Sequence, residues 1–348
     1  MTISIIGTVG VPACYGGFET LVENLLEVKN DDNKLVVYCS SKAYNEKQDC
    51  YKNAQLVYIP LNANGIQSIP YDICSIMHAV FIQKSRNLLI LGVSGAICLP
   101  LVRLFSKTKV VTNIDGLEWR RDKWGKLAKR FLKFSEKVAV RYSDIIVADN
   151  KGIADYVLEE YQVDSEVIAY GGDHALVKET EELDDGYALA LCRIEPENNV
   201  ELILESFSKT NTKLKFIGNW ENSDFGKSLK NKYKDFSNIE ILDPIYDLNV
   251  LFDVRQRCKF YVHGHSAGGT NPSLVEMMHF EKTVFAFDCN YNRASTEDKA
   301  NYFSQTSELL EFINSVPDER NAKHMKEIAQ RRYTWDIVKQ QYLDLFDE

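Results

Sequence analysis

The first half of the chain alternates short apolar runs with segments of helical periodicity. Several of these runs are continuous stretches of Val, Ile and Leu, which are typical of strands covered on both faces of a parallel sheet. Helical segments between such runs are typical of βαβ units. The pattern predicts strands at 3–7, 34–40, 54–60, 87–92, 109–115 and 144–149, and helices at 17–29, 72–84, 126–142 and 151–161.

The second half repeats this alternation. It predicts strands at 166–172, 187–194, 213–219, 238–245, 259–265 and 283–288, and helices at 198–209, 225–235, 247–257 and 272–280. The expected fold class is α/β, with two facing Rossmann-like, doubly wound domains and a cleft at the carboxyl ends of both sheets. We expect domains at 1–170 and 171–325, with a hinge near the glycines of 170–174. Residues 326–348 are expected to form a C-terminal helix that packs back on the first domain.

Composition narrows the function classes. The formal net charge of −9 over 348 residues argues against nucleic acid as the main partner. Eight cysteines without a CxxC pair favour free thiols in a reducing compartment. No apolar run reaches the ~18 residues of a spanning helix, and the N-terminus lacks the pattern of a secretory signal. We therefore expect a cytoplasmic protein.

Gly16 and Gly17 stand between the first strand and the first helix. A strand–glycine–helix turn directs free backbone N–H groups and the positive end of the helix dipole at whatever lies beside it. Two interpretations remain open, a tight turn without a ligand and a turn that a phosphate or sugar approaches closely. The GxGxxG spacing of dinucleotide-binding proteins is absent, which disfavours a hydride-transfer enzyme.

A second glycine turn follows the strand at 259–265. Gly268, Gly269, Thr270 and Asn271 precede a helix that begins at Pro272, so several backbone donors are expected to be exposed at its N-terminus. Glu276 lies one turn into this helix, where a carboxylate can accept hydrogen bonds from sugar or ribose hydroxyls. The alternative is that Glu276 only complements the helix dipole.

Positive charge is concentrated in residues 119–141, which carry nine Lys and Arg against Asp122 and Glu136. From Lys126 the pattern predicts a helix with apolar positions at 127, 131, 134 and 138 and basic residues on its other faces. Such a helix can lie on an anionic membrane. A solvated helix with ordinary core anchors is the alternative.

The chain resembles retaining glycosyltransferases of the two-Rossmann-domain (GT-B) type, family 4, over nearly its full length. More closely, it resembles the bacterial rhamnosyltransferases of capsule and cell-wall polysaccharide assembly. The similar segments are GVPACYGGFETLVENL, NIDGLEWRRDKWGK, LCRIEPENN, GGTNPSLVEMM and a terminal Y-x-W. The resemblance implies that the second domain binds a nucleotide-diphosphate sugar and that the first domain binds the acceptor.

The resemblance also implies roles for particular residues. Arg193 would meet the donor diphosphate, Glu276 would bind the ribose, and Asp115 would face the transferred sugar; these three are the candidate catalytic residues. The candidate donor-binding residues are Gly16, Gly17, Arg193, Asn198, Gly268, Gly269, Thr270, Asn271 and Glu276. The candidate acceptor or membrane residues are Glu118, Trp119, Arg120, Arg121, Lys126, Lys129, Arg130 and Lys133.

Two positions depart from the family pattern. A lysine is common five residues after the arginine, where this chain has Asn198, and a glutamate is common eight residues before Glu276, where it has Gly268. No Asp-x-Asp triplet is present, so we expect neither a metal nor another cofactor. His263 and His265 lie two apart on one strand face, where a polar cleft lining or structural histidines are preferred over metal ligands.

The expected function is transfer of a sugar with retention, namely L-rhamnose from dTDP-L-rhamnose, onto a polyprenyl-diphosphate-linked saccharide at the inner membrane surface. The basic segment is also a candidate for contact with the acceptor's diphosphate. The alternatives are a UDP- or GDP-hexose donor, a sugar-nucleotide epimerase of the same fold, and an inactive nucleotide-sugar-binding protein.

Overall fold

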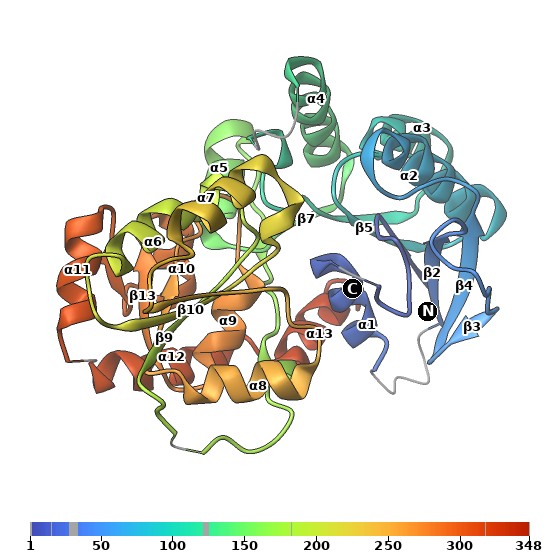
Figure 1. Ribbon diagram of the computed structural model, residues 1–348. Coiled ribbons are helices and arrows are strands. Elements are labelled where there is room, and N and C mark those ends of the chain that lie inside the picture. Colours follow the sequence, from blue (N-terminus) through green and yellow to red (C-terminus); the bar gives the residue numbers. More distant parts are fainter. Residues whose placement is uncertain are drawn as a thin grey trace. The chain divides into compact units, whose positions relative to one another are not determined.

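The computed structural model describes residues 2–14, 16–27, 34–120, 125–181, 183–316 and 318–347 (Figure 1). The chain folds into two compact units. The first consists of Met1–Ala169 and Val338–Glu348, and the second of Tyr170–Ile337. Each unit is built around one sheet, and the two are described separately below.

The first unit contains an eight-stranded sheet in the order β3-β4-β2-β1-β5-β6-β7-β8. Its strands are β1 (Thr2–Ile6), β2 (Lys34–Ser40), β3 (Cys50–Tyr51), β4 (Ala54–Ile59), β5 (Asn87–Leu91), β6 (Lys109–Asn113), β7 (Ile145–Ala148) and β8 (Glu166–Val167). All neighbours are parallel except β3, which pairs antiparallel with β4 at the edge. The chain reverses direction across the sheet between β1 and β5, which makes this unit doubly wound.

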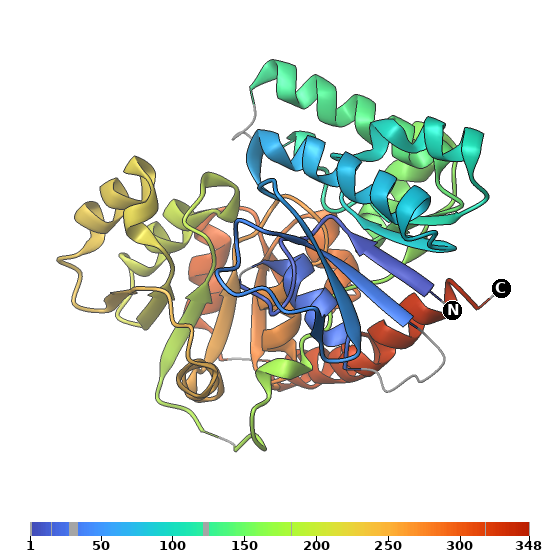
Figure 2. The same cartoon turned by 90° about the vertical axis from the view of Figure 1, so that its right-hand side faces the viewer.

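Helices cover both faces of this sheet. They are α1 (Gly17–Leu25), η1 (Gly65–Gln67), α2 (Ser68–Met77), the π-helical turn η2 (His78–Ile82), η3 (Ala96–Cys98), α3 (Leu99–Phe105), η4 (Glu118–Arg120), α4 (Lys126–Tyr142) and α5 (Lys151–Tyr161). α2, α3 and α4 lie together over one face of the sheet, as Figure 1 and the turned view in Figure 2 both show. The predicted helices at 126–142 and 151–161 are confirmed to the residue.

The second unit contains a six-stranded, fully parallel sheet in the order β11-β10-β9-β12-β13-β14. Its strands are β9 (Tyr187–Leu191), β10 (Lys213–Ile217), β11 (Ile239–Leu242), β12 (Phe260–His263), β13 (Thr283–Phe287) and β14 (Asn301–Phe303). This is the strand order of a doubly wound Rossmann-like sheet, and its direction reverses between β9 and β12.

The helices of the second unit are η5 (Asp173–Ala175), η6 (Pro196–Asn198), α6 (Val200–Phe207), η7 (Trp220–Asn222), α7 (Asp224–Tyr233), α8 (Leu248–Arg257), α9 (Pro272–Met278), α10 (Asn290–Thr296), α11 (Thr306–Asn314), α12 (Glu319–Arg332) and α13 (Trp335–Asp344), which continues into the first unit. One core joins α6, α7 and α11 to the sheet, around the fully buried Phe207, Phe216 and Trp220. Burial of such side chains stabilises the fold by about 1.5–3 kcal/mol each.

The structure corrects two expectations at the domain boundaries. The strand expected at 166–172 ends at Val167 and pairs with β7 in the first sheet, so it is not part of the second half. Residues 326–348 do not form one helix, because Tyr333 ends α12. The Tyr333 side chain is buried and its hydroxyl donates to the Ser295 carbonyl (2.7 Å), which keeps α12 in the second unit.

One buried hydrogen bond ties the C-terminal segment to the first sheet. The amide of Asn113, at the end of β6, donates to the hydroxyl of Tyr342 (2.7 Å), and both side chains are buried. We predict that Tyr342→Phe lowers the free energy of unfolding of the first unit by about 1–3 kcal/mol, because it leaves the Asn113 amide unpaired. Urea unfolding followed by circular dichroism measures this change. Tyr246→Phe, at a side chain that is 74% exposed, is the control, and equal midpoints for the two variants would contradict the prediction.

Candidate functional site

The strand-order reversal of the second unit brings two loops together at the carboxyl edge of its sheet. The loop after β9 (192–199) and the loop after β12 (264–271) are joined by hydrogen bonds. Asn199 Nδ2 donates to the Gly264 carbonyl (2.8 Å), and the backbone N–H of Ser266 donates to the Glu197 carbonyl (2.9 Å). A Cβ at Gly264 would lie 2.2 Å from the Asn198 carbonyl oxygen, so only glycine fits there. Ligands of doubly wound sheets bind at such edges, and most of the predicted donor-binding residues lie on these two loops.

Asn198 has a structural role that differs from its expected contact with a donor. The side chain is buried; its Nδ2 donates to the Arg193 carbonyl (2.7 Å), and its Oδ1 accepts from His265 Nδ1 (2.7 Å). Both polar atoms of the side chain are therefore satisfied within the protein. In place of a lysine that could neutralise phosphate, the chain has an amide that links the two loops.

Arg193 is exposed on the loop after β9, and its guanidinium lies 3.7 Å from the Glu195 carboxylate. A surface ion pair of this length is weak. The Arg193 side chain can therefore exchange Glu195 for another anion at little cost.

The glycine turn before α9 is less open than its sequence suggests. Gly268, Gly269 and Thr270 are buried, contrary to the exposed backbone donors that we expected. Gly268 has φ +103°, a value that favours glycine. Asn271 caps α9 by accepting from the backbone N–H of Ser273 (3.0 Å). Residues 271–273 are partly exposed, so the open part of this turn is the helix start itself.

Glu276 in α9 is part of a charged cluster. Its Oε2 pairs with the guanidinium of Arg255 from α8, a side chain that is only 4% exposed. Its Oε1 lies 3.2 Å from His174 Nε2. Burial alone would disfavour the ionised carboxylate, but Arg255 and His174 overcome this effect, so the pKa of Glu276 lies below its ordinary value. Glu276 is thus ionised and fixed in orientation.

A tryptophan fixes the tautomer of His174. Trp335 Nε1, which can only donate, lies 2.9 Å from His174 Nδ1. The proton of the neutral imidazole must therefore be on Nε2, where it faces Glu276. Neither Arg255 nor His174 was among the predicted site residues; the signals available in the sequence were the terminal Y-x-W and the glycines before His174.

Those glycines allow the segment 170–174 to pack closely on its neighbours. A Cβ at Gly171 would lie 2.5 Å from the Trp335 ring, and one at Gly172 would lie 2.7 Å from the backbone of Glu276. The rings of Tyr170 and Trp335 are also in edge contact, with centroids 4.8 Å apart. The segment 170–174 therefore packs directly against Trp335 and the middle of α9.

His263 and His265 are buried at the end of β12. Burial and the neighbouring His265 lower the pKa of His263 well below its ordinary value, so it is neutral. Among the described residues, no group of three His, Cys, Asp or Glu side chains comes close enough to hold a metal ion.

In the first unit, Gly16 and Gly17 lie where β1 leads into α1, as expected, but a side chain fills the turn. Glu19 is buried and accepts hydrogen bonds from the Thr8 hydroxyl (2.9 Å) and the Val9 backbone (2.8 Å). A Cβ at Gly16 (φ +130°) would lie 2.0 Å from Glu19 Oε2. The positive φ favours glycine at position 16 whatever the space around it. Glu19 was missed because a glutamate in a first helical turn has an ordinary explanation, the helix dipole.

Asp115 lies just beyond the end of β6 in an unusual backbone conformation. Its φ is +59° and that of Leu117 is +50°, values that cost free energy for side-chain-bearing residues. The backbone N–H of Asp115 donates to the Asn113 side chain (2.9 Å), which supports the turn.

Asp72 of α2 is buried beneath the loop that follows β5, and its carboxylate accepts a hydrogen bond from the Ser94 hydroxyl. Burial raises the pKa of Asp72 to about 7, although the Ser94 hydroxyl acts in the opposite direction.

The predicted acceptor or membrane residues separate into two groups. Trp119 and Lys133 contact the buried Glu136, with Trp119 Nε1 at 2.9 Å and Lys133 Nζ at 3.4 Å. Tyr156 and Tyr161 also donate to Glu136 (2.6 Å each). Arg120 lies over the rings of Trp119 and Tyr156. These residues anchor η4 to α4 and α5, whereas Lys126, Lys129 and Arg130 lie on the first turns of α4. Arg121 and the side chain of Glu118 lie outside the described residues.

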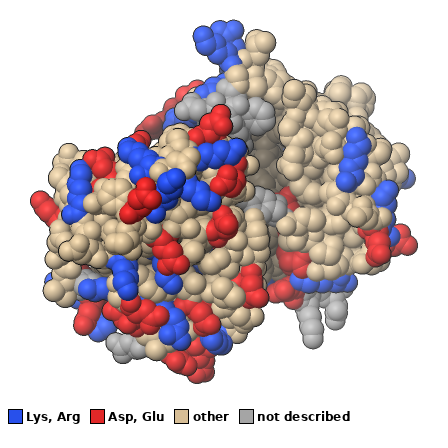
Figure 3. Space-filling view, viewed as in Figure 1, with Lys and Arg blue, Asp and Glu red and all other residues tan. Residues whose placement is uncertain are grey.

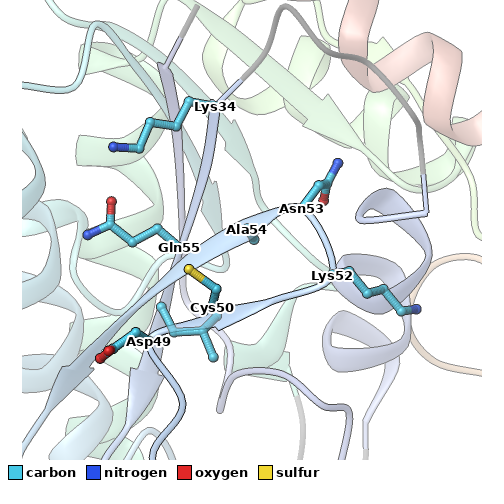
Figure 4. A pocket seen from close by; sticks show the side chains of 8 residues that line it. Lys34, Asp49, Cys50, Lys52, Asn53, Ala54 and Gln55 are labelled. Atoms are coloured by element: carbon cyan, nitrogen blue, oxygen red, sulfur yellow. The ribbon is translucent and has the colours of Figure 1, made fainter.

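Two pockets of the first unit lie at opposite ends of its strands. The larger, about 480 Å³, lies at the amino ends of β2 and β4 and is lined by residues such as Lys34, Asp49 and Gln55 (Figure 4). The smaller, about 240 Å³, lies at the carboxyl ends of β1, β2 and β4 and is lined by Val9, Ser40, Lys42, Ala43 and 62–64. The smaller pocket lies at the carboxyl ends of the strands, where ligands of doubly wound sheets generally bind.

Solved structures share this fold over the full length of the chain. Sucrose-phosphate synthase from Thermosynechococcus elongatus matches with a TM-score of 0.78 and 12% identity, over 99% of this chain and 98% of that one. HepE from Anabaena, in complex with UDP, matches with a TM-score of 0.73 and 14% identity over 99% of both chains. A glycosyltransferase from Rickettsia africae matches with a TM-score of 0.73 and 12% identity, over 99% of this chain and 97% of that one. The fold is that of the GT-B glycosyltransferases.

The predicted α/β fold class with two doubly wound sheets is thereby confirmed, and identities of 12–14% show the fold alone. A family model described as "Domain of unknown function (DUF1972)" matches residues 1–173. No curated protein matches the sequence.

The Glu276 cluster predicts a pH-dependent stability. Because the folded-state pKa of Glu276 lies below its ordinary value of 4.5, its stabilising contribution is present above that value and is lost as pH falls through the folded pKa. We expect Glu276→Gln to cost roughly 3 kcal/mol near pH 7, since it leaves the Arg255 charge buried and unpaired. The difference from wild type should shrink below about pH 4.5.

Urea unfolding of the two proteins across this pH range measures the effect. Glu240→Gln is the matched control, because Glu240 is 56% exposed and lies 3.9 Å from Lys215. A cost for Glu276→Gln that stays constant down to the lowest pH would contradict the assignment.

Proposed function

We propose that the protein is a retaining glycosyltransferase that takes its donor as a nucleotide-diphosphate sugar. The observation that carries the proposal is the full-length match to glycosyltransferase structures, one of which contains UDP. The reversal point of the second sheet supports it, because most of the residues expected to bind the donor lie on the two loops that follow β9 and β12 there.

In this proposal Glu276 binds the ribose of the donor. Each oxygen of its carboxylate has one partner in the protein, Arg255 or His174. A carboxylate oxygen can accept more than one hydrogen bond, so both can still receive ribose hydroxyls. The partly exposed start of α9 and the exchangeable Arg193 would receive the diphosphate, with the helix dipole favouring its negative charge.

The chemistry follows from the leaving group. Cleavage of the bond between the sugar C1 and the phosphate oxygen develops positive charge on the sugar and negative charge on the departing diphosphate. Arg193 and backbone donors would stabilise the diphosphate, by about 3 kcal/mol for a well-placed donor. The acceptor hydroxyl attacks C1 on the face that the diphosphate leaves, and its proton passes to the phosphate oxygen. No protein nucleophile or metal ion is required.

We further propose a rhamnosyl donor, dTDP-L-rhamnose, and a lipid-linked saccharide acceptor in surface polysaccharide synthesis. The resemblance of GGTNPSLVEMM and the other quoted segments supports these finer assignments. A UDP-hexose is the second candidate donor, favoured by the complexes of HepE with UDP and UDP-glucose. The acceptor is assigned to the first unit, where the pocket beside Lys42 and Asn62 lies at the carboxyl edge of the sheet.

The donor is tested first by binding. Thermal-shift measurements with dTDP-, UDP- and GDP-sugars should show stabilisation by one nucleotide class, because only a ligand of the folded state raises the unfolding temperature. The best donor is then assayed for transfer to a lipid-diphosphate saccharide. No shift with any nucleotide sugar would contradict the proposed function.

We predict that Glu276→Ala lowers transfer at least about tenfold, because ribose contacts and the position of α9 both depend on this carboxylate. The variant should retain the circular dichroism spectrum of the wild type. Glu240→Ala is the control in the same unit and should leave transfer unchanged. Full activity of Glu276→Ala would exclude Glu276 from the site.

A further inference from the structure

The helical face of the first unit exposes large apolar side chains. On α3, Leu99 and Val102 are buried, whereas Leu101, Leu104 and Phe105 are 50%, 71% and 68% exposed. Ile82 at the end of η2 is 69% exposed. Figure 3 shows the surface over α2 and α3 as mostly tan, with few charged atoms. Large apolar side chains that are exposed together on one surface are typical of interaction sites.

The neighbouring α4 exposes both apolar and basic side chains. Its exposed positions include Leu127, Arg130, Phe134, Lys137 and Arg141, which recur every three or four residues and so share one face of the helix. Leu127 is 81% exposed and Phe134 is 60% exposed. α3 packs beside α4 over the same sheet, so the two helices present their exposed side chains on the same side of the first unit.

The charge of this surface has a single sign. Residues 60–109 carry five Lys or Arg and one acid, Asp72, and residues 125–143 carry six and one acid, Glu136. Asp72 and Glu136 are 4% and 1% exposed. Asp144, just beyond α4, is paired with Arg103 (2.7 Å). In a chain of net charge −9, the outward face of these helices is therefore basic and apolar.

We propose that the face formed by η2, α3 and α4 docks on an anionic lipid bilayer. Apolar side chains of α3 and α4 enter the interface, and Arg130, Lys137 and Arg141 meet the headgroups. Exposed apolar surface alone would fit a protein partner, but the absence of an exposed acid on these helices fits a uniformly negative surface. No helix among the described residues is long and apolar enough to span a membrane.

This surface differs from the basic segment that the sequence indicated. Trp119 and Lys133 face Glu136 inside the unit and are not part of it. The apolar side chains of α3 take their place. The inference rests on the surface itself, although a lipid-linked acceptor of the proposed transfer would be met there.

Vesicle co-sedimentation tests the proposal without any sugar substrate. The full chain should bind vesicles of phosphatidylcholine with phosphatidylglycerol, bind phosphatidylcholine alone weakly, and be released by added salt. Leu104→Ser/Phe105→Ser should reduce binding at least about tenfold, and Arg130→Gln/Lys137→Gln/Arg141→Gln should abolish the preference for anionic lipid. All these side chains are exposed, so the fold should persist.

Leu248→Ser/Val250→Ser is the matched control, because Leu248 and Val250 are exposed apolar residues on α8 of the second unit. Binding that is equal for both lipids, or unchanged in the α3 variant, would overturn the proposal. The proposal would also be overturned if the wild-type chain formed a dimer in solution, the α3 variant were monomeric, and neither protein bound vesicles. In that case the face would join two copies of the chain. The donor nucleotide should raise the unfolding temperature of the α3 variant as much as that of the wild type. A failure of membrane docking can therefore be distinguished from a failure of the proposed sugar transfer.

Discussion

The candidate donor site depends on one buried interaction, the ion pair between Glu276 and Arg255. Arg255 is almost fully buried, and a buried guanidinium without a carboxylate would be strongly destabilising. The pair therefore fixes the last turn of α8 against the middle of α9. His174 adds the segment 170–174 to the same carboxylate, and Trp335 fixes the tautomer that lets it do so. Three segments far apart in the sequence are thus positioned by one carboxylate.

The sequence was sufficient for most of the fold because the strands are covered on both faces. Continuous apolar runs such as 88–91 are typical of strands in the interior of a parallel sheet, and this one is fully buried in β5. The strands that it missed are short or at an edge, such as Cys50–Tyr51 and Asn301–Phe303. Their backbone pairing depends on a neighbouring strand and is accompanied by no apolar run.

The site was less predictable, because a glycine or carboxylate has several uses. Gly16 suggested an approaching ligand, but Glu19 of the protein fills the space. The pairing of Glu276 with Arg255 and His174 joins residues 21 and 102 positions apart, and no local pattern encodes such contacts. The burial of Asn198 could not be predicted from the residues around it, because its partner His265 lies on the loop after β12, 67 residues away.

Burial of acids also decides where the first unit presents positive charge. Glu136 accepts hydrogen bonds from Trp119, Tyr156 and Tyr161 inside the unit, so two residues that looked suited to a membrane, Trp119 and Lys133, are used as internal anchors. The same burial removes the only acid of α4 from its surface. Basic residues at the next helical positions are then left facing outward without a compensating charge on their own helix. A chain that is acidic as a whole can therefore present a basic face wherever its helices turn their carboxylates inward.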